Sequence, residues 1–191
     1  MHIELTDHLR CPASHEEAFL VLLPDQMDGR RVLAGHLGCP ICGWSTDWRD
    51  GVPDFGDGWR SEGTMPCDAE SVAALLGLSG PGGWVALAGA AGALAEPLGV
   101  LLGGVSLVAV NPPQSLEPGE QLSVITSAAW PIKAQALRGV VLGADAADWC
   151  EQAVRSVLPG LRAVGVGAGP AESAAVETLA SADELWVARR R

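Results

Sequence analysis

The sequence predicts an α/β protein in which a small, cysteine-bearing β module precedes a domain built on a mainly parallel sheet. Two observations predict this class. After residue 84, short apolar segments alternate with helix-forming ones, as expected when buried strands are joined by helices. Before residue 57, the chain holds all four histidines and three of its five cysteines. Because 48% of the 191 residues are hydrophobic and only 18% are charged, a packed core is expected.

The first part of the chain predicts strands and turns. Residues 18–39 indicate two short strands around a polar turn at 24–30. Residues 50–66 are punctuated by Gly, Asp and Pro and predict a loop, so residues 1–56 form one module and residues 57–66 a linker. The second domain spans residues 67–191. It begins with a helix within 67–83, for which Asp68 provides the N-cap and glycines close the end.

The rest of the second domain alternates strands with helices. Helices are expected at 91–103, where Pro97 delays or bends the start, at 145–158 with Asp145 near its start, and at 170–182 with Pro170 at its beginning. Strands are expected at 84–89, 105–111, 122–128, 137–144, 161–169 and 184–190. Because these strands are apolar throughout, the sheet should be buried on both faces and mainly parallel.

The charge balance excludes one class of partner. The formal net charge is −11, with 5 basic and 11 acidic residues in 1–66 and 7 and 12 in 67–191. Neither part offers the basic footprint that phosphate binding needs, so direct binding to nucleic acid is not expected. A basic protein partner would instead be attracted.

The sequence also indicates a compartment. Residues 84–110 are almost wholly apolar, but Glu96 and Pro97 lie near the middle, so a buried strand–helix–strand unit is expected rather than a membrane span. No signal-peptide pattern opens the chain, and the number of cysteines is odd. A reducing, cytoplasmic compartment with metal-bound thiolates is therefore expected instead of disulfides.

The segment CPICG at 39–43 predicts half of a zinc site. Its Cys-x-x-Cys spacing lets one turn present two thiolates to one ion, and the following glycine relieves that turn. A tetrahedral site needs two further ligands. The upstream segment 9–17 repeats the Cys-Pro dipeptide at Cys11 and offers His15 four residues later, whereas Ser14, in the place of a second cysteine, is a poor zinc ligand.

The predicted metal ligands are three thiolates and one imidazole: Cys11, His15, Cys39 and Cys42. Four protein ligands close the site, so the metal is expected to be structural zinc. Two alternatives stay open. Either His8 or His36 supplies the fourth ligand, or Cys11 and His15 only pack and the site is lost.

This part of the sequence resembles the small zinc-ribbon family of methyltransferase activators, and the similar ribbon at the front of some bacterial methyltransferases. That pattern runs Leu-x-Cys-Pro-x-Cys, a β-hairpin, Leu-x-Cys-x-x-Cys-Gly, an aromatic residue and Asp-Gly-Ile/Val-Pro. The chain departs from it at Ser14 and at Trp48-Arg49, where the family prefers Tyr-Pro-Ile. The resemblance implies a zinc ribbon that docks on protein surfaces or steadies a neighbouring domain. The matching residues are Leu9, Cys11, Pro12, Leu37, Cys39, Cys42, Gly43, Asp50, Gly51, Val52 and Pro53.

Residues 67–188 are similar to the class I S-adenosylmethionine-dependent methyltransferases in the order of their features. Residues 85–94 stand where the cofactor loop belongs, and 105–113 at the second strand, where an acidic residue usually holds the ribose hydroxyls. Residues 127–132 resemble the segment beside the adenine, 137–145 the fourth strand, and 153–167 the turn into the fifth. The resemblance implies a trimmed Rossmann-like fold, because little room remains between Gly104 and Trp130 for a helix.

The cofactor-binding positions of that family are mostly replaced. Against its Asp-x-Gly-x-Gly-x-Gly loop, this chain has Ala86 at the acidic place and alanine at two glycine places, 88 and 90. If a cofactor pocket is retained, its remaining elements are Gly89, Gly92 and, in place of the ribose-binding acid, Asn111. An amide accepts fewer hydroxyls than a carboxylate, so S-adenosylmethionine binding is not expected.

Other chemistry has little support. Cys67 and Cys150 lie in a domain without histidine, so neither has a base to activate it. Asp145, Asp148 and Glu151 are spaced for one solvated helix face. Trp44, Trp48 and Trp59 lie in or just after the ribbon, where aromatic residues serve either as core or as interface anchors.

The function predicted from sequence is therefore a non-catalytic interaction or scaffold protein, in which a zinc ribbon joins a degenerate methyltransferase-like domain. It would dock on another protein or associate with itself. One alternative is an active methyltransferase for a small molecule or a protein. Another is a structural subunit of a larger assembly.

Overall fold

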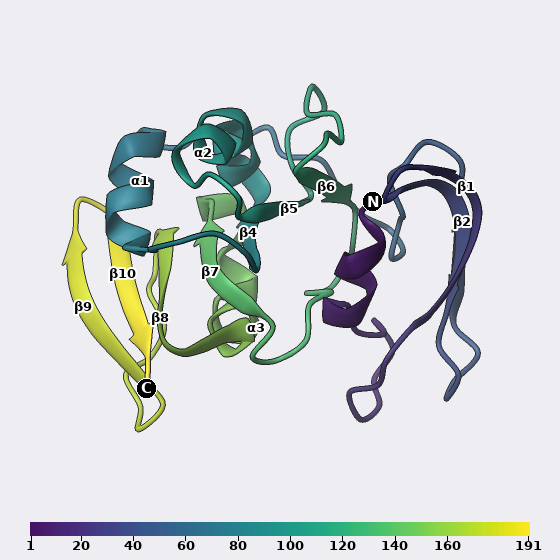
Figure 1. The fold of residues 1–191 in the computed structure, drawn as a ribbon. Coiled ribbons are helices and arrows are strands. Elements are labelled where there is room, and N and C mark those ends of the chain that lie inside the picture. The colour runs from purple at the N-terminus through teal and green to yellow at the C-terminus, as the bar shows by residue number, and fades with distance from the viewer.

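The strands form two sheets in the computed structural model, which describes residues 1–191 (Figure 1). A three-stranded antiparallel sheet of order β1-β2-β3 belongs to the N-terminal module, and a seven-stranded sheet has the order β6-β5-β4-β7-β8-β10-β9. The elements are η1 (Ile3–His8), β1 (Val21–Asp28), β2 (Arg31–Gly38), β3 (Ser45–Trp48), α1 (Ala69–Leu76), β4 (Trp84–Ala88), η2 (Gly89–Leu94), α2 (Ala95–Leu101), β5 (Ser106–Val110), β6 (Leu122–Ile125), β7 (Leu137–Leu142), η3 (Ala144–Trp149), α3 (Cys150–Ser156), β8 (Val157–Val166), β9 (Val176–Ala182) and β10 (Leu185–Arg190).

The larger sheet is mainly parallel, as predicted. Strands β4 to β8 pair in parallel, and only β10 runs against its two neighbours, β8 and β9. In chain order the parallel strands lie 3-2-1-4-5, which is the doubly wound arrangement, and the order reverses between β4 and β7. The expected trimmed Rossmann-like sheet behind a small β module is therefore confirmed.

Alternate residues of the central strand serve two different cores. Val85 and Leu87 of β4 pack in one cluster with Val72 of α1 and Leu98 of α2. Their neighbours Ala86 and Ala88 face the opposite side, where the second cluster also includes residues of α3 and of the N-terminal module. The central strands β4, β5 and β7 are thus covered on both faces, which explains why they are almost wholly apolar. No helix is both long and apolar enough to span a membrane.

The caps of α1 agree with the sequence. The Asp68 carboxylate accepts a hydrogen bond of 2.8 Å from the backbone N–H of Ser71, which satisfies one of the free donors at the helix start. The helix ends at Gly77, whose φ of 61° is the left-handed conformation that favours glycine.

The helix expected at 170–182 is wrong: residues 176–182 form the edge strand β9. Strand β8 pairs with one edge of β10, so the backbone N–H and C=O groups along the other edge of β10 need a partner. Strand β9 supplies it, and Glu177 on β9 lies 2.7 Å from Arg189 on β10. Tertiary pairing overrides the alanine-rich composition of this segment.

The N-terminal module attaches to the sheet through main-chain contacts. The N–H of Arg10 donates to the carbonyl of Pro131, and the N–H of Lys133 donates to the carbonyl of His8. Further along, the N–H of Phe55 donates to the carbonyl of Thr126, just after β6. As a result, the hydrophobic core of the module is continuous with the core on one face of the larger sheet.

Candidate metal centre and candidate cofactor crevice

Four metal-ligating side chains meet in the N-terminal module. The Sγ atoms of Cys11, Cys39 and Cys42 and a ring nitrogen of His15 all lie within 4.8 Å of one another. Cys11 Sγ is 3.6 Å from Cys42 Sγ, and Cys39 Sγ is 3.4 Å from His15 Nε2. Ligands bound at about 2.3 Å to a tetrahedral zinc ion lie about 3.8 Å from one another. The cluster therefore has the size and the donor set of a Cys3His zinc site.

The turn that carries two of the thiols is built as the sequence predicts. The N–H of Gly43 donates to the carbonyl of Cys39, and Gly43 has a φ of 73°, which a residue with a side chain rarely adopts. The N–H of Trp44 donates to Cys42 Sγ at 3.5 Å. A backbone N–H directed at a sulfur stabilises a thiolate, which is the form that binds metal.

The orientation of His15 also suits ligation. Its Nδ1 lies 2.6 Å from the carbonyl oxygen of Glu16, so with the proton on Nδ1 the lone pair of Nε2 faces Cys39. Metal-bound histidines commonly make this contact through the nitrogen that does not bind the ion.

The thiols of the cluster differ electrostatically. The backbone N–H groups of Cys42 and Ile41 lower the pKa of the Cys39 thiol. Burial raises the pKa of the Cys11 thiol. A divalent cation bound among them would favour the thiolate at both positions.

His8 and His36, the alternative candidates for the fourth ligand, lie outside the cluster. His36 pairs through Nδ1 with the Asp47 carboxylate at 3.0 Å, and the ring of His8 lies 6.0 Å from the ring of Trp84. The grouped residues are thus the four that the sequence indicated, with His15 as the only histidine among them.

The candidate cofactor crevice lies at the carboxyl ends of the parallel strands. In open α/β sheets, ligands bind where the strand order reverses, which here is between β4 and β7. At this point Asp145 follows β7, and its Oδ1 accepts a hydrogen bond of 3.0 Å from the N–H of Ala90. A Cβ placed on Gly89 would overlap the Asp145 carboxylate. The space beside Gly89 is therefore taken by the protein itself.

Gly92 and Asn111 are used in the same way. A Cβ on Gly92 would overlap Pro112. Asn111 is fully buried, and its amide donates to the carbonyl of Ser127 at 2.7 Å and accepts from the N–H of Ser127 at 2.8 Å. Both polar atoms of the amide are thus hydrogen-bonded within the protein, and their burial keeps them away from a ligand at the surface.

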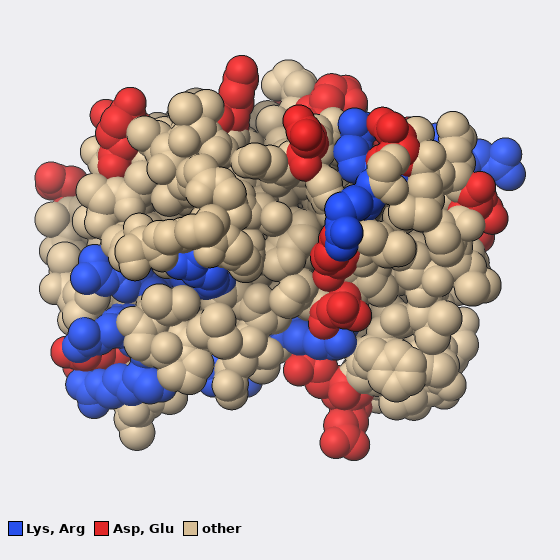
Figure 2. Space-filling view, viewed as in Figure 1, with Lys and Arg blue, Asp and Glu red and all other residues tan.

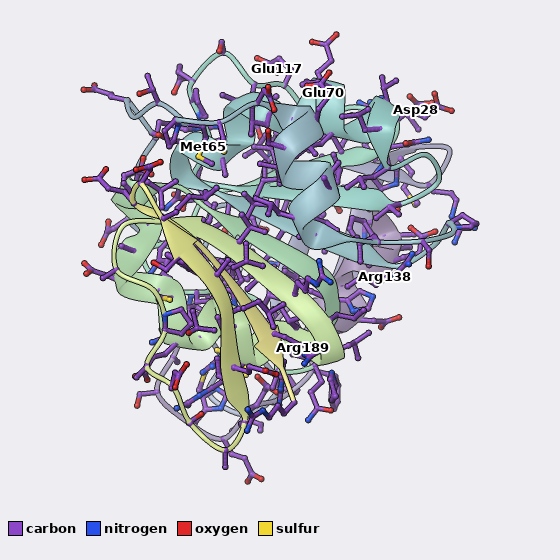
Figure 3. All side chains as sticks on the ribbon, turned by 90° about the vertical axis from the view of Figure 1, so that its left-hand side faces the viewer. Asp28, Met65, Glu70, Glu117, Arg138 and Arg189 are labelled. Atoms are coloured by element: carbon purple, nitrogen blue, oxygen red, sulfur yellow. The ribbon has the colours of Figure 1, made fainter.

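Residues 57–66, which we call the strap, cross the same edge of the sheet. Gly58 packs against Thr126 after β6, and Ser61 forms an isolated parallel bridge with Pro113 after β5. The Ser61 hydroxyl then donates to the Asp145 carboxylate. Figure 3 shows Met65 of the strap near one end of the strands and Arg138, at the start of β7, near the other end.

Sequence reasoning missed the pair of Ser61 and Asp145. Asp145 is exposed, as a solvated helix face implies, and its carboxylate also joins the strap to the loop after β4. The two residues are separated by 84 positions, and neither occurs in a motif, so no local signal could have paired them. Trp59 also lies in the strap, and its ring is 5.9 Å from the ring of Trp149.

The two remaining cysteines lie apart from the metal cluster. Burial, and secondly the charge of Glu151, raise the pKa of the Cys150 thiol to about 11. Burial also raises the pKa of the Cys67 thiol. Neither environment activates a nucleophile.

Comparisons with known proteins give structural likenesses but no match in sequence. No protein-family model matches the sequence, and no curated protein matches it. Among solved structures, the fold is similar to the crystal structure of P. horikoshii TYW2 in complex with MeSAdo. The identity is 11%, the TM-score is 0.40, and the match covers 82% of this chain and 69% of that chain. We assign no activity from a likeness at this level.

Proposed function

We propose that this protein is a non-catalytic docking protein, in which a structural zinc site supports a Rossmann-like domain whose cofactor crevice is filled by its own chain. The observation that carries the proposal is the arrangement around Asp145. Its carboxylate, held by Ala90 and by Ser61 of the strap, lies where a ligand would approach the loop after β4.

The residues that could retain a cofactor are instead packed against other parts of the chain, which supports the proposal. Glycines in such a loop let a ligand approach the backbone closely, but here Asp145 and Pro112 occupy the space beside Gly89 and Gly92. Asn111 is paired with Ser127 and shielded from solvent. S-adenosylmethionine would have to displace these contacts before it could bind.

Zinc would act by holding the module together. The metal would cross-link the segment at Cys11 and His15 to the turn at Cys39 and Cys42. Because four protein ligands leave no open position, the ion would not activate water. The proposed role of the metal is therefore to stabilise the fold of a surface that meets a partner.

The test is a thermal melt of zinc-loaded protein with and without S-adenosylmethionine, repeated with S-adenosylhomocysteine. A ligand at about 100 times its Kd adds about 2.7 kcal/mol, which raises Tm by several degrees in a chain of this size. We expect no rise with either compound at millimolar concentration. Metal analysis of the purified protein should give one zinc per chain.

A rise in Tm with either compound would overturn the proposal and favour the alternative of an active methyltransferase. In that case Asp145→Ala should strengthen the shift, because it frees the crevice. The second alternative, a structural subunit, predicts that the protein aggregates when purified alone, which size-exclusion chromatography would reveal.

A further inference from the structure

Large apolar side chains are exposed in strand β1 and in the segment that leads into it. Phe19, two residues before β1, and Leu23 are 63% and 59% exposed, and Val21 between them is 42% exposed. Leu20 and Leu22 pack into the core, so exposed and core residues alternate here and Val21 and Leu23 lie on the outward side of β1. Ile41, in the turn of the metal cluster, is 63% exposed as well. We call Phe19, Val21, Leu23 and Ile41 the apolar face.

The concentration of these residues is unusual for this molecule. Of its nine exposed large hydrophobic residues, five belong to the module: Phe19, Val21, Leu23, Met27 and Ile41. Single exposed apolar side chains need no explanation, but grouped ones mark interaction sites. In Figure 2 the surface over the module is largely uncharged, with both acidic and basic side chains along its border with the larger domain.

The edge of strand β1 is guarded against pairing with another strand. Pro24 cannot donate a hydrogen bond, and the pairing of β1 with β2 shifts register between Pro24 and Gln26. Proline and bulges are devices that protect exposed edges. An occupant of this surface would therefore cover the apolar side chains rather than extend the sheet.

Charge distinguishes between the candidate occupants. Between Arg10 and Arg30 the chain holds no Lys or Arg and four exposed acids: Glu16, Glu17, Asp25 and Asp28. The Glu17 carboxylate accepts from the N–H of Ala134 and Asp28 lies 3.8 Å from Arg31, whereas Glu16 and Asp25 form no ion pair. In a symmetric dimer the same patch meets itself, so these acids would face their own copies in a protein of net charge −11. A basic rim on the occupant would be attracted instead.

We propose that the apolar face binds a partner protein through an apolar patch that is rimmed by Lys and Arg. This inference rests on the proposed docking function and names the surface and the chemistry of the partner. The apolar side chains would supply most of the affinity, and the exposed acids Glu16 and Asp25, which lie near them in the sequence, would favour a basic partner and speed association.

The experiment measures binding of short fluorescent peptides to zinc-loaded protein by anisotropy. One peptide alternates leucine and lysine, a second leucine and glutamate, and a third serine and lysine. We expect binding of the first peptide only. Phe19→Ser with Leu23→Ser should weaken that binding at least tenfold, since loss of an anchor typically costs that much.

The matched control is Val100→Ser, which removes an apolar side chain that is 80% exposed on α2. It should leave binding unchanged, and both variants should melt at the temperature of the parent protein. Equal loss in both variants, equal binding of the leucine–glutamate peptide, or a dimer that Phe19→Ser with Leu23→Ser abolishes would each overturn the inference. These results do not depend on S-adenosylmethionine, so the proposed function can fail while the apolar face stands, and the reverse.

Discussion

Two hydrogen bonds on one carboxylate attach the strap to the sheet. Asp145 accepts from the Ser61 hydroxyl and from the N–H of Ala90, which joins residues that follow β4 and β7 to a segment that precedes α1. Because Ser61 is only 6% exposed, its hydroxyl depends on the Asp145 carboxylate rather than on water as a hydrogen-bond acceptor.

We expect Ser61→Ala to lower the free energy of unfolding by about 0.5–1.5 kcal/mol, the usual net contribution of one hydrogen bond, because the exposed Asp145 carboxylate keeps access to water. Urea denaturation measures this change. The control is Ser115→Ala at an exposed position, which should stay within about 0.5 kcal/mol of the parent protein. Equal stability of the two variants would show that the strap is not held by this contact.

The Cys150 thiol should react slowly. Its pKa of about 11, raised by burial and by Glu151, leaves little thiolate near neutral pH, and the side chain is buried. In zinc-loaded protein we expect iodoacetamide to modify Cys67 before Cys150, because Cys67 is only half-buried. Mass spectrometry after timed labelling, with Cys67→Ser to confirm the assignment, measures the two rates. Faster labelling of Cys150 would contradict its buried position.

At the scale of an element, α1 depends on its first cap. The hydrogen bond from Ser71 lowers the pKa of the Asp68 carboxyl, so the cap stabilises the fold above the ordinary pKa of aspartate. That stability is lost as the pH falls through the lowered value, because the unfolded chain then binds the proton more readily.

We expect Asp68→Ala to lower Tm at neutral pH by a few degrees, whereas Asp68→Asn, which can still accept the bond, should lower it less. Thermal melts across acidic pH provide the second readout. The difference between the parent protein and Asp68→Asn should narrow as the pH falls below about 4, where aspartate begins to protonate. A difference that widens there would contradict the sign of this linkage.

Strand β9 illustrates why some elements escape sequence reasoning. Its composition favoured a helix, whereas the segments for β4, β5 and β7 were placed correctly because they are apolar throughout and bounded by turn residues. Strand β9 has no such pattern, because its side chains are half-buried or exposed. It was the unpaired side of β10 that required a strand at this position.

At the scale of the whole molecule, the module and the larger domain share one hydrophobic cluster. Cys11 and Cys39 belong to the same core as Trp84 and Leu142 of the larger sheet. Loss of order around the metal ligands would therefore expose apolar surface in both parts.

We expect removal of metal with a chelator to lower the stability of the entire chain, with one calorimetric transition before and after removal. Cys39→Ser should have the same effect without chelator, since structural zinc contributes folding free energy directly. Cys67→Ser, outside the cluster, is the control and should melt like the parent protein. Two separate transitions after metal removal would show that the larger domain is stable without the module.

The sequence by itself determined the class of the fold and the composition of the metal cluster. Apolar runs specify buried strands, and the spacing of Cys39 and Cys42 specifies a turn with two thiols, because both signals are local. The sequence also indicated Cys11 and His15 as their companions, and the structure places the four side chains together.

Only the tertiary structure decided what packs beside Gly89 and Asn111 and which surface remains exposed. The contacts of Asp145 with Ser61 and Ala90, and of Asn111 with Ser127, join segments that are distant in the chain or belong to no motif. Exposure of Val21 and Leu23 likewise depends on which side of β1 meets the core. Such features follow from packing between elements, and no local pattern of residues encodes them.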